Sequence, residues 1–357
     1  MIVSGLARGR RARWIPAALA VAAFALPATA AAKREAEPLS LGPVAPRPAA
    51  GPVRDALLDG AGLERLRATK SSAVDHYDDG DGHSVSIEVS RSYSNRVPIA
   101  RNLARFLGSL LHGDEMNQLS ATVATPAEIR NLCGAGALAC YSPVSEQMVV
   151  SGEDASPGEP PRELVIAHEY GHHVAANRSN RPWSALDRGT KRWSTHERIC
   201  RGIERRKIRP SQYLENPGEA YAEAYAFLHY PDVIRWQWKI AQPDAAAFDA
   251  IRADVSFPWT RRTTVEWSGE LDKRNPRDVM RVETPLDGRL KVKLDGPRGA
   301  DFDLALLAAR RGKVLDRAAG DGPNDTLRHT VCGRRAVRVA VIRDSGRGAF
   351  DITAARP

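Results

Sequence analysis

The sequence predicts an α+β protein in which a mixed β-sheet packs against two helices and a small antiparallel β-sandwich follows. Two observations support this prediction. From residue 84 to residue 177 the apolar pattern alternates between period two and period 3.6, in the order strand, helix, strand, strand, helix. After about Trp259 the chain becomes a series of short alternating segments separated by Gly, Asp and Pro turns, which is typical of a small sandwich.

The first 30 residues predict an export signal. Arginines precede an apolar run from Ile15 to Leu26, and Ala28-Thr29-Ala30 then forms an A-x-A cleavage pattern. The run is too short to span a bilayer as a helix, which needs about 20 apolar residues. We therefore expect a secreted protein that loses residues 1–30 and has no stable membrane insertion afterwards.

The charge of the mature chain argues against a nucleic-acid partner. Removal of four leader arginines lowers the formal charge from +9 to +5. The remaining arginines stand among acids, as in LDKRNPRDV, without a basic stripe interleaved with aromatic residues. We expect a monomer.

Composition divides the rest of the chain. Residues 31–70 include the Pro- and Ala-rich stretch KREAEPLSLGPVAPRPAAGPV and are predicted to be a linker or a short pro-segment. Residues 71–258 form the predicted main domain, and residues 259–357 form the sandwich. The acidic run DHYDDGDGH has Tyr77 where a calcium loop needs an acid, so a turn is predicted there.

Within the main domain each predicted element has a local signal. SVSIEVSRSY and QLSATVAT alternate as strands do, and RVPIARNLARFLGSLL has helical spacing. A short helix begins at TPAEIRNL, with Thr125 as N-cap and Pro126 at the first helical position. ACYSPVSEQMVVSGE predicts a hairpin or edge strand. The last helix follows Pro160-Pro161 and runs from about Arg162 to Asn177.

Four cysteines suggest disulfides in an oxidising compartment. Cys133 and Cys140 flank a small-residue loop, CGAGALAC, that allows bridging distance, and we expect this bridge. Cys200 and Cys332 then pair by elimination, although either could be free.

The segment HEYGHH carries the chemistry. On a helix His168 and His172 lie on one face, four residues apart, and can direct two nitrogens at one metal ion. Glu169 can act as the general base for a metal-bound water. The apolar residues before His168 bury this helix, and buried imidazoles are costly without a metal or other partners. Gly171 suggests a close packing contact, and His173 is expected at the surface or behind the ligands.

A third metal ligand is predicted in YLENPGEAYAEAYAF. Asn216 and Pro217 begin a helix that places Glu219 and Glu223 on one face. The simpler alternative is a capping box for Glu219 and a solvated charge at Glu223. Because the surrounding Ala, Tyr and Phe residues bury the helix, two carboxylates there need partners, which a metal and its histidines would supply.

These two motifs resemble the gluzincin class of HExxH zinc metallopeptidases, most closely its lethal-factor-like branch of secreted bacterial zincins. Glu219 follows His172 by 47 residues. The resemblance implies a zincin-like mixed sheet with a backing helix and an active-site helix, a Zn²⁺ cofactor held by His168, His172 and Glu219, and Glu223 supporting a ligating histidine. It also implies that a tyrosine stabilises the oxyanion.

For that tyrosine the sequence offers Tyr213, whose spacing to Glu219 is one residue short of the expected pattern, and less favourably Tyr221 or Tyr225. The resemblance further implies an edge strand that binds the peptide in antiparallel orientation, for which SEQMVVSG is the candidate and which the Cys133–Cys140 bridge would brace. The C-terminal segment is similar in texture to the small β-sandwich modules appended to secreted bacterial peptidases.

The sequence therefore predicts a secreted zinc-dependent endopeptidase whose partner is a peptide or protein substrate. One alternative is a secreted binding or adhesion protein in which the sandwich binds the partner and the zincin scaffold is non-catalytic. Another is a metal-dependent hydrolase that uses the same residues on a different amide or an ester.

Overall fold

The α+β fold predicted from the sequence is confirmed. The computed structural model describes residues 34–357 except 37, 42–43, 45–52, 54, 58–60, 63, 66–73, 79–81, 155 and 233–235. The predicted signal segment, residues 1–30, lies outside the described residues. Within the described part of the chain, no helix has the length and apolar character needed to cross a membrane.

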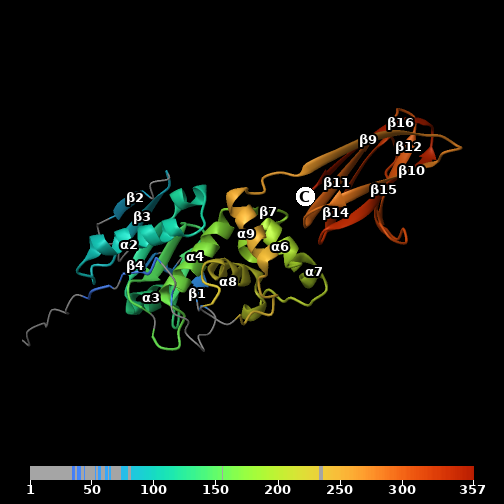
Figure 1. Ribbon diagram of the computed structural model, residues 1–357. Helices are drawn as coiled ribbons and strands as arrows, with labels where there is room; N and C mark the ends of the chain where they lie inside the picture. Colours follow the sequence, from blue (N-terminus) through green and yellow to red (C-terminus); the bar gives the residue numbers. More distant parts are fainter. Residues whose placement is uncertain are drawn as a thin grey trace, which may run out of the picture. The chain divides into compact units, whose positions relative to one another are not determined.

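Among the described residues, six strands form a mixed sheet in the order β1-β5-β6-β4-β3-β2 (Figure 1). The pairs β3/β4, β4/β6 and β1/β5 are parallel, whereas β2/β3 and β5/β6 are antiparallel. The strands are β1 (Asp55–Leu57), β2 (Val74–Asp78), β3 (Ser84–Val89), β4 (Ser120–Ala124), β5 (Ala139–Ser142) and β6 (Gln147–Ser151).

Alternation along these strands sends side chains to two different cores. Ala121 and Val123 of β4 join the main hydrophobic core, while the next residue, Ala124, joins a separate small one. Helices α2 (Arg96–Ser109) and α4 (Arg162–Ala176) contribute to the main core, and α3 (Pro126–Cys133) contributes to the small one. The sheet is therefore covered by α2 and α4 on one face and by α3 on the other.

The bounds of α2, α3 and α4 agree closely with the sequence pattern. Thr125 caps α3 by accepting a hydrogen bond from the Glu128 backbone, and the Glu128 side chain accepts from the Thr125 backbone in return. Of the remaining helical elements in the described part of the chain, only α8 (Pro217–His229) was predicted from the sequence. They are the 3₁₀ turns η1 (Asp114–Gln118) and η2 (Tyr213–Glu215), and the helices α5 (Ala185–Arg188), α6 (Lys191–His196), α7 (Ile199–Glu204), α8 (Pro217–His229) and α9 (Ala245–Ser256). A two-stranded ribbon of β7 (Ser179–Asn180) and β8 (Trp183–Ser184) precedes α5.

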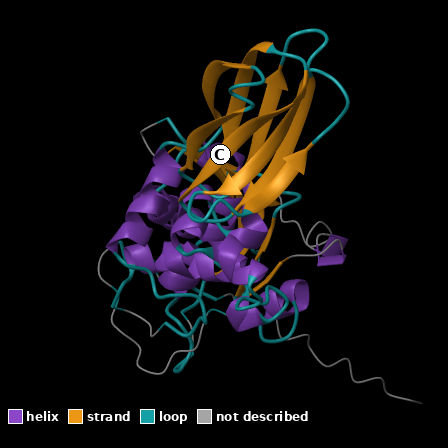
Figure 2. Cartoon of the chain, turned by 90° about the vertical axis from the view of Figure 1, so that its right-hand side faces the viewer, coloured by secondary structure: helices purple, strands orange, loops and turns teal. Residues whose placement is uncertain are grey.

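The C-terminal antiparallel β-sandwich is also confirmed. Its two sheets have the orders β10-β15-β12-β13 and β14-β11-β16-β9, and every pairing within them is antiparallel (Figure 2). Inward-facing residues such as Leu290, Phe302 and Phe350 form its own core. The strands are β9 (Thr263–Leu271), β10 (Arg277–Thr284), β11 (Gly288–Asp295), β12 (Asp301–Ala308), β13 (Val314–Ala318), β14 (Asn324–Val331), β15 (Arg335–Ser345) and β16 (Gly348–Arg356).

Both disulfides are present. Cys133–Cys140 joins the end of α3 to β5, with Cα atoms 5.9 Å apart. Cys200–Cys332 joins α7 to the residue after β14, with Cα atoms 5.3 Å apart. Two disulfides favour an oxidising compartment, extracellular or periplasmic.

Two local predictions need correction. The segment SEQMVVSG forms β6, which lies between β5 and β4 and is not an edge strand. Its hydrophobic residues are buried on both sides because neighbouring strands and helices cover it. The acidic run was predicted as a turn, but residues 75–78 belong to β2, which pairs with β3; residues 79–81 of the run lie outside the described residues.

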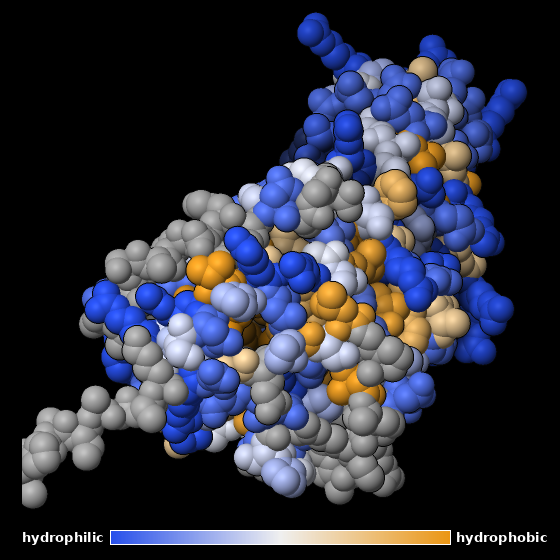
Figure 3. Space-filling model, turned by 60° about the vertical axis from the view of Figure 1, so that its left-hand side comes forward, coloured by the Kyte–Doolittle hydropathy of each residue, from blue (hydrophilic) through white to orange (hydrophobic). Residues whose placement is uncertain are grey.

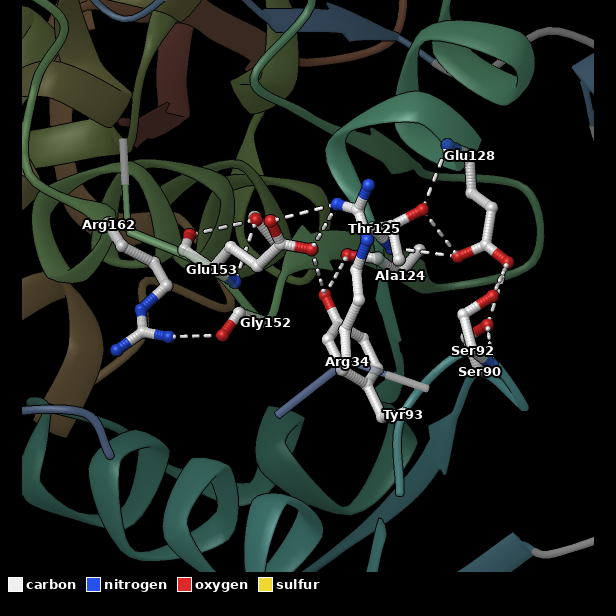
Figure 4. A network of polar contacts seen from close by, with 11 residues as sticks. Arg34, Ser90, Ser92, Tyr93, Ala124, Thr125, Glu128, Gly152, Glu153 and Arg162 are labelled. Carbon is white, nitrogen blue, oxygen red and sulfur yellow. Dashed lines mark hydrogen bonds and ion pairs between the residues drawn. The ribbon is translucent and has the colours of Figure 1, made fainter. Parts of the chain in front are cut away.

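Several described residues of the segment 31–70 pack against the domain, unlike a solvated linker. Ala36, Leu39 and Val53 belong to the main core. Arg34 donates two hydrogen bonds to the Glu153 carboxylate, at 2.8 and 3.0 Å, beside Tyr93 (Figure 4). The Arg162 guanidinium donates to the carbonyls of Gly152 and Pro38. This segment is therefore held by both apolar and polar contacts.

The face in Figure 3 shows small groups of hydrophobic side chains among hydrophilic ones. Single apolar side chains at a surface are ordinary. The hydrophobic groups on this face are therefore no sign of a membrane or a broad hydrophobic partner.

Helices α4 and α8 approach each other closely at Gly171. A Cβ atom on Gly171 would lie 2.9 Å from the Cα and 3.1 Å from the carbonyl oxygen of Ala222. Both are backbone atoms, so they cannot move aside as a side chain can. The close contact predicted from Gly171 is confirmed, and the residue type follows from the crossing of two buried helices.

We predict that Gly171→Ala lowers the free energy of unfolding by up to about 2 kcal/mol. The overpacking costs about 1–3 kcal/mol, and the better helix propensity of Ala offsets ~1 kcal/mol of it. Chemical denaturation of the two chains measures this difference. Gly202→Ala in α7 is the matched control, because the added methyl would meet the flexible side chain of Ile208 instead of backbone. Equal losses in the two variants would contradict the proposed reason.

Candidate metal centre

Helix α4 brings His168 and His172 to one point. All side chains from Arg162 to Ala175 are buried, and the rings of the two histidines lie 5.0 Å apart. The four-residue spacing accounts for this arrangement, since such residues stack on one helix face. Their Nε2 atoms both face the same third residue, which comes from α8.

That residue is Glu219, in the first turn of α8. Asn216 caps this helix by accepting from the Gly218 backbone, and Pro217 occupies the first position. Glu219 therefore does not form the capping box that was the simpler alternative. Its Oε2 lies 3.6 Å from Nε2 of His168 and 3.4 Å from Nε2 of His172.

A fourth group, Asp55 of β1, was not found by the sequence analysis. Its Oδ2 lies 3.2 Å from Nε2 of His172 and 3.8 Å from Nε2 of His168, and its side chain is 2% exposed. Among the described residues, one ligand atom from each of Asp55, His168, His172 and Glu219 lies within 4.8 Å of the other three. No motif or residue spacing in the sequence points to Asp55, which lies in the segment predicted to be a linker or pro-segment.

The four groups fit a metal ion. Tetrahedral zinc ligands at about 2.0–2.1 Å from the ion stand roughly 3.3 Å apart, close to the separations observed. Within the described residues, the facing atoms of all four side chains are buried and make no hydrogen bond. Such unsatisfied atoms are costly unless an ion fills the space between them. The Asp/His/His/Glu group could therefore bind a metal.

Glu223 supports His168 from the other side of its ring. Its Oε2 lies 3.0 Å from Nδ1 of His168, and both side chains are buried. A hydrogen bond donated by Nδ1 orients the ring so that Nε2 faces the other three groups. Glu223 is thus not the solvated charge that the alternative reading allowed.

Glu169 stands beside this group with both carboxylate oxygens buried and without a hydrogen bond to the described residues. Burial raises the pKa of Glu169 well above its usual value, and the nearby charge of Asp55 raises it further. Burial lowers the pKa of His172, but the nearby carboxylates of Glu219 and Asp55 outweigh it and raise the pKa to about 10. These carboxylates therefore favour the protonated form of His172, and a metal bound here would have to displace that proton.

Of the three candidate tyrosines, the structure brings Tyr213 to the group. Its hydroxyl donates to the Val53 carbonyl and lies 3.1 Å from Oδ1 of Asp55. Tyr225 instead donates to the Leu111 carbonyl, and the ring of Tyr221 packs edge-on against Trp193.

The expectation that His173 lies at the surface is wrong, because its side chain is fully buried. Its Nδ1 lies 3.0 Å from the Tyr141 hydroxyl of β5, and its Nε2 lies 2.8 Å from the Glu115 carbonyl. Burial lowers the pKa of His173. It therefore links α4 to β5 and to η1 and takes no part in the metal group.

A cavity of about 420 Å³ lies beside the metal group. His172 and Glu219 form part of its wall, together with Asp187 and Arg188 of α5. The guanidinium of Arg188 lies 4.9 Å from the centre of the Trp183 ring. This cavity provides space next to the ligands that a substrate side chain could occupy.

No protein-family model and no curated protein matches the sequence. Solved structures with local similarity include the pre-peptidase C-terminal domain of collagenase from Bacillus anthracis, with 14% identity over 26% of this chain and 89% of that one and a TM-score of 0.23. Yersinia pseudotuberculosis-derived mitogen has 15% identity over 27% of this chain and 87% of that one, with a TM-score of 0.22.

Aeromonas hydrophila PliG, a periplasmic inhibitor of g-type lysozyme, has 8% identity over 26% of this chain and 86% of that one, with a TM-score of 0.20. At these TM-scores the similarities assign neither a fold nor a function to this chain.

We predict that the purified chain binds one zinc ion and that Glu219→Ala strongly reduces the bound zinc, because a ligand atom is lost. Elemental analysis after dialysis against metal-free buffer measures it. Glu270→Ala, an exposed glutamate of β9, is the matched control and should retain full zinc. Unchanged zinc in Glu219→Ala would exclude Glu219 as a ligand.

Proposed function

We propose that this protein is a secreted zinc-dependent endopeptidase. The observation that carries the proposal is Glu169, a buried carboxylate that makes no hydrogen bond to any residue the structure describes and lies beside an Asp/His/His/Glu group. A purely structural ion site has no use for such a group, which is costly to bury. A general base for hydrolysis needs this placement.

Nitrogen and oxygen ligands at these separations favour zinc over the harder cations, which prefer oxygen ligands alone. When bound, zinc would polarise the scissile carbonyl and lower the pKa of a water molecule. Glu169 would take a proton from that water and pass it to the leaving amine. Glu223 would hold His168 in the orientation that binding requires.

Tyr213 is suited to hydrogen-bond donation. Burial, together with the carboxylates of Asp55 and Glu219, raises its pKa, so its hydroxyl stays protonated at neutral pH. A protonated hydroxyl beside the metal group can donate to the oxygen that becomes negative during peptide hydrolysis. This favours the oxyanion role for Tyr213 over Tyr221 and Tyr225.

Secretion is supported by two independent features. The disulfides favour an oxidising compartment, and residues 1–30 have the sequence pattern of an export signal.

One observation favours the alternative function, a binding or adhesion protein with a structural ion. Four protein groups face the metal position, whereas a catalytic zinc usually has three and keeps a place for water. The two functions differ in what Glu169 does. In a structural site its replacement changes neither metal content nor biological effect.

We predict that Glu169→Gln abolishes hydrolysis and leaves zinc bound, because the amide cannot take a proton but keeps the shape of the side chain. The measurement is chelator-sensitive cleavage of an unfolded protein, with elemental analysis on the same samples. Because Asp55 stands where water would bind, the Glu169→Gln variant is compared with its parent in two backgrounds. One is the native chain, and the other carries Asp55→Ala.

The mechanism would be wrong if Glu169→Gln retained full cleavage in either background. Absence of cleavage in every chain that contains zinc would favour the binding-protein alternative.

A further inference from the structure

Strand β1 covers the one edge of β5 that β6 leaves open. Asp55, Ala56 and Leu57 pair with Ala139, Cys140 and Tyr141, while the other edge of β5 pairs with β6. Without β1, β5 would present an unpaired row of backbone groups at the edge of the sheet. An open edge of this kind is where an extended peptide adds as a further strand.

The direction of β1 is the reverse of that expected for a substrate. β1 runs parallel to β5, whereas the gluzincin resemblance implies a peptide antiparallel to the edge strand. A segment bound in reverse presents its peptide bonds to the catalytic groups in the wrong polarity. It can therefore occupy the edge without being an aligned substrate.

The register of β1 accounts for the placement of Asp55. Its partner Ala139 belongs to the main core on the α4 face, and paired residues of neighbouring strands project to the same face. Asp55 consequently projects toward α4, where its Oδ2 lies 3.2 Å from Nε2 of His172. The carboxylate takes the fourth position around the candidate metal, which a catalytic site leaves to water.

Tyr213 is engaged by the same segment. Its hydroxyl, the proposed donor to the substrate oxygen, donates to the Val53 carbonyl, and the Val53 side chain is fully buried in the main core. Further contacts hold the preceding residues: the Ser40 amide donates to Glu163 at 2.9 Å, and Arg34 binds Glu153. Val53 and β1 thus occupy the strand edge, the metal position and the oxyanion donor between them.

We infer that Val53 and β1 keep the full chain latent, with Asp55 as the removable fourth metal ligand and β1 as a reversed occupant of the substrate edge. This inference rests on the proposed peptidase function. Of the two predictions for residues 31–70, a linker or a short pro-segment, it favours the pro-segment. Activation requires β1 to leave β5, which a cut in the chain between Leu57 and β2 would permit.

The test replaces Asp55 in the full secreted chain. Asp55→Ala should raise cleavage of an unfolded protein by about tenfold or more, since water gains the fourth position. It should also speed the loss of zinc to a competing chelator by about tenfold or more, because one ligand is lost. The nearly isosteric Asp55→Asn should act in the same direction, and thermal melts of both variants verify folding.

Asp249→Asn is the matched control, because Asp249 is exposed and pairs with Arg252 on the surface of α9. It should change neither rate. If the native chain cleaves the substrate and Asp55→Ala changes neither the cleavage rate nor the rate of zinc loss, the proposed latency is wrong. The proposed peptidase function would still stand. Faster zinc loss without cleavage by any chain would make Asp55 a structural ligand and contradict both proposals.

Discussion

The close crossing of α4 and α8 is the constraint on which the metal group depends. Gly171 lets the backbone of α4 approach Ala222 of α8 at a distance that a methyl group would prevent. Because Gly171 adjoins His172, this contact also sets how near the carboxylates of α8 come to the histidines. Glu219 and Glu223 then flank His168 on its two ring nitrogens. Gly171 thus helps to position Glu219 and Glu223 beside the histidines.

Burial is the second constraint. A group of carboxylates and imidazoles with no exposed side chain is unfavourable unless its charges are balanced by one another, by protons or by a metal. Without a metal, ion pairing raises the pKa of His172 to about 10 despite burial. Asp55 adds a second negative charge at the same place, so the closed group is matched to a divalent cation. The segment that supplies β1 and the Asp55 carboxylate is therefore held beside the histidines partly by this charge balance.

Much of the candidate site could be predicted from local pattern. The spacing in HEYGHH identified His168 and His172, and the capped helix at Asn216 identified Glu219 and Glu223. These predictions succeeded because helix periodicity turns sequence spacing directly into a shared face. Asp55 could not be found in this way, since a parallel strand pair joins residues 84 positions apart and leaves no periodic signal. His173 was misjudged for a related reason, because its partners Tyr141 and Glu115 come from other elements.

The sequence by itself determined the α+β class, the starts of the two helices that carry His168, His172 and Glu219, the sandwich and the cysteine pair at 133 and 140. Each depends on contacts between near neighbours along the chain: periodicity, caps and turn residues. Only the tertiary structure decided which strand lies at the edge of the sheet, which tyrosine reaches the metal group, and that Asp55 closes it. Those depend on long-range pairing, in which the partner is chosen by the packing of the whole domain and not by the adjoining residues.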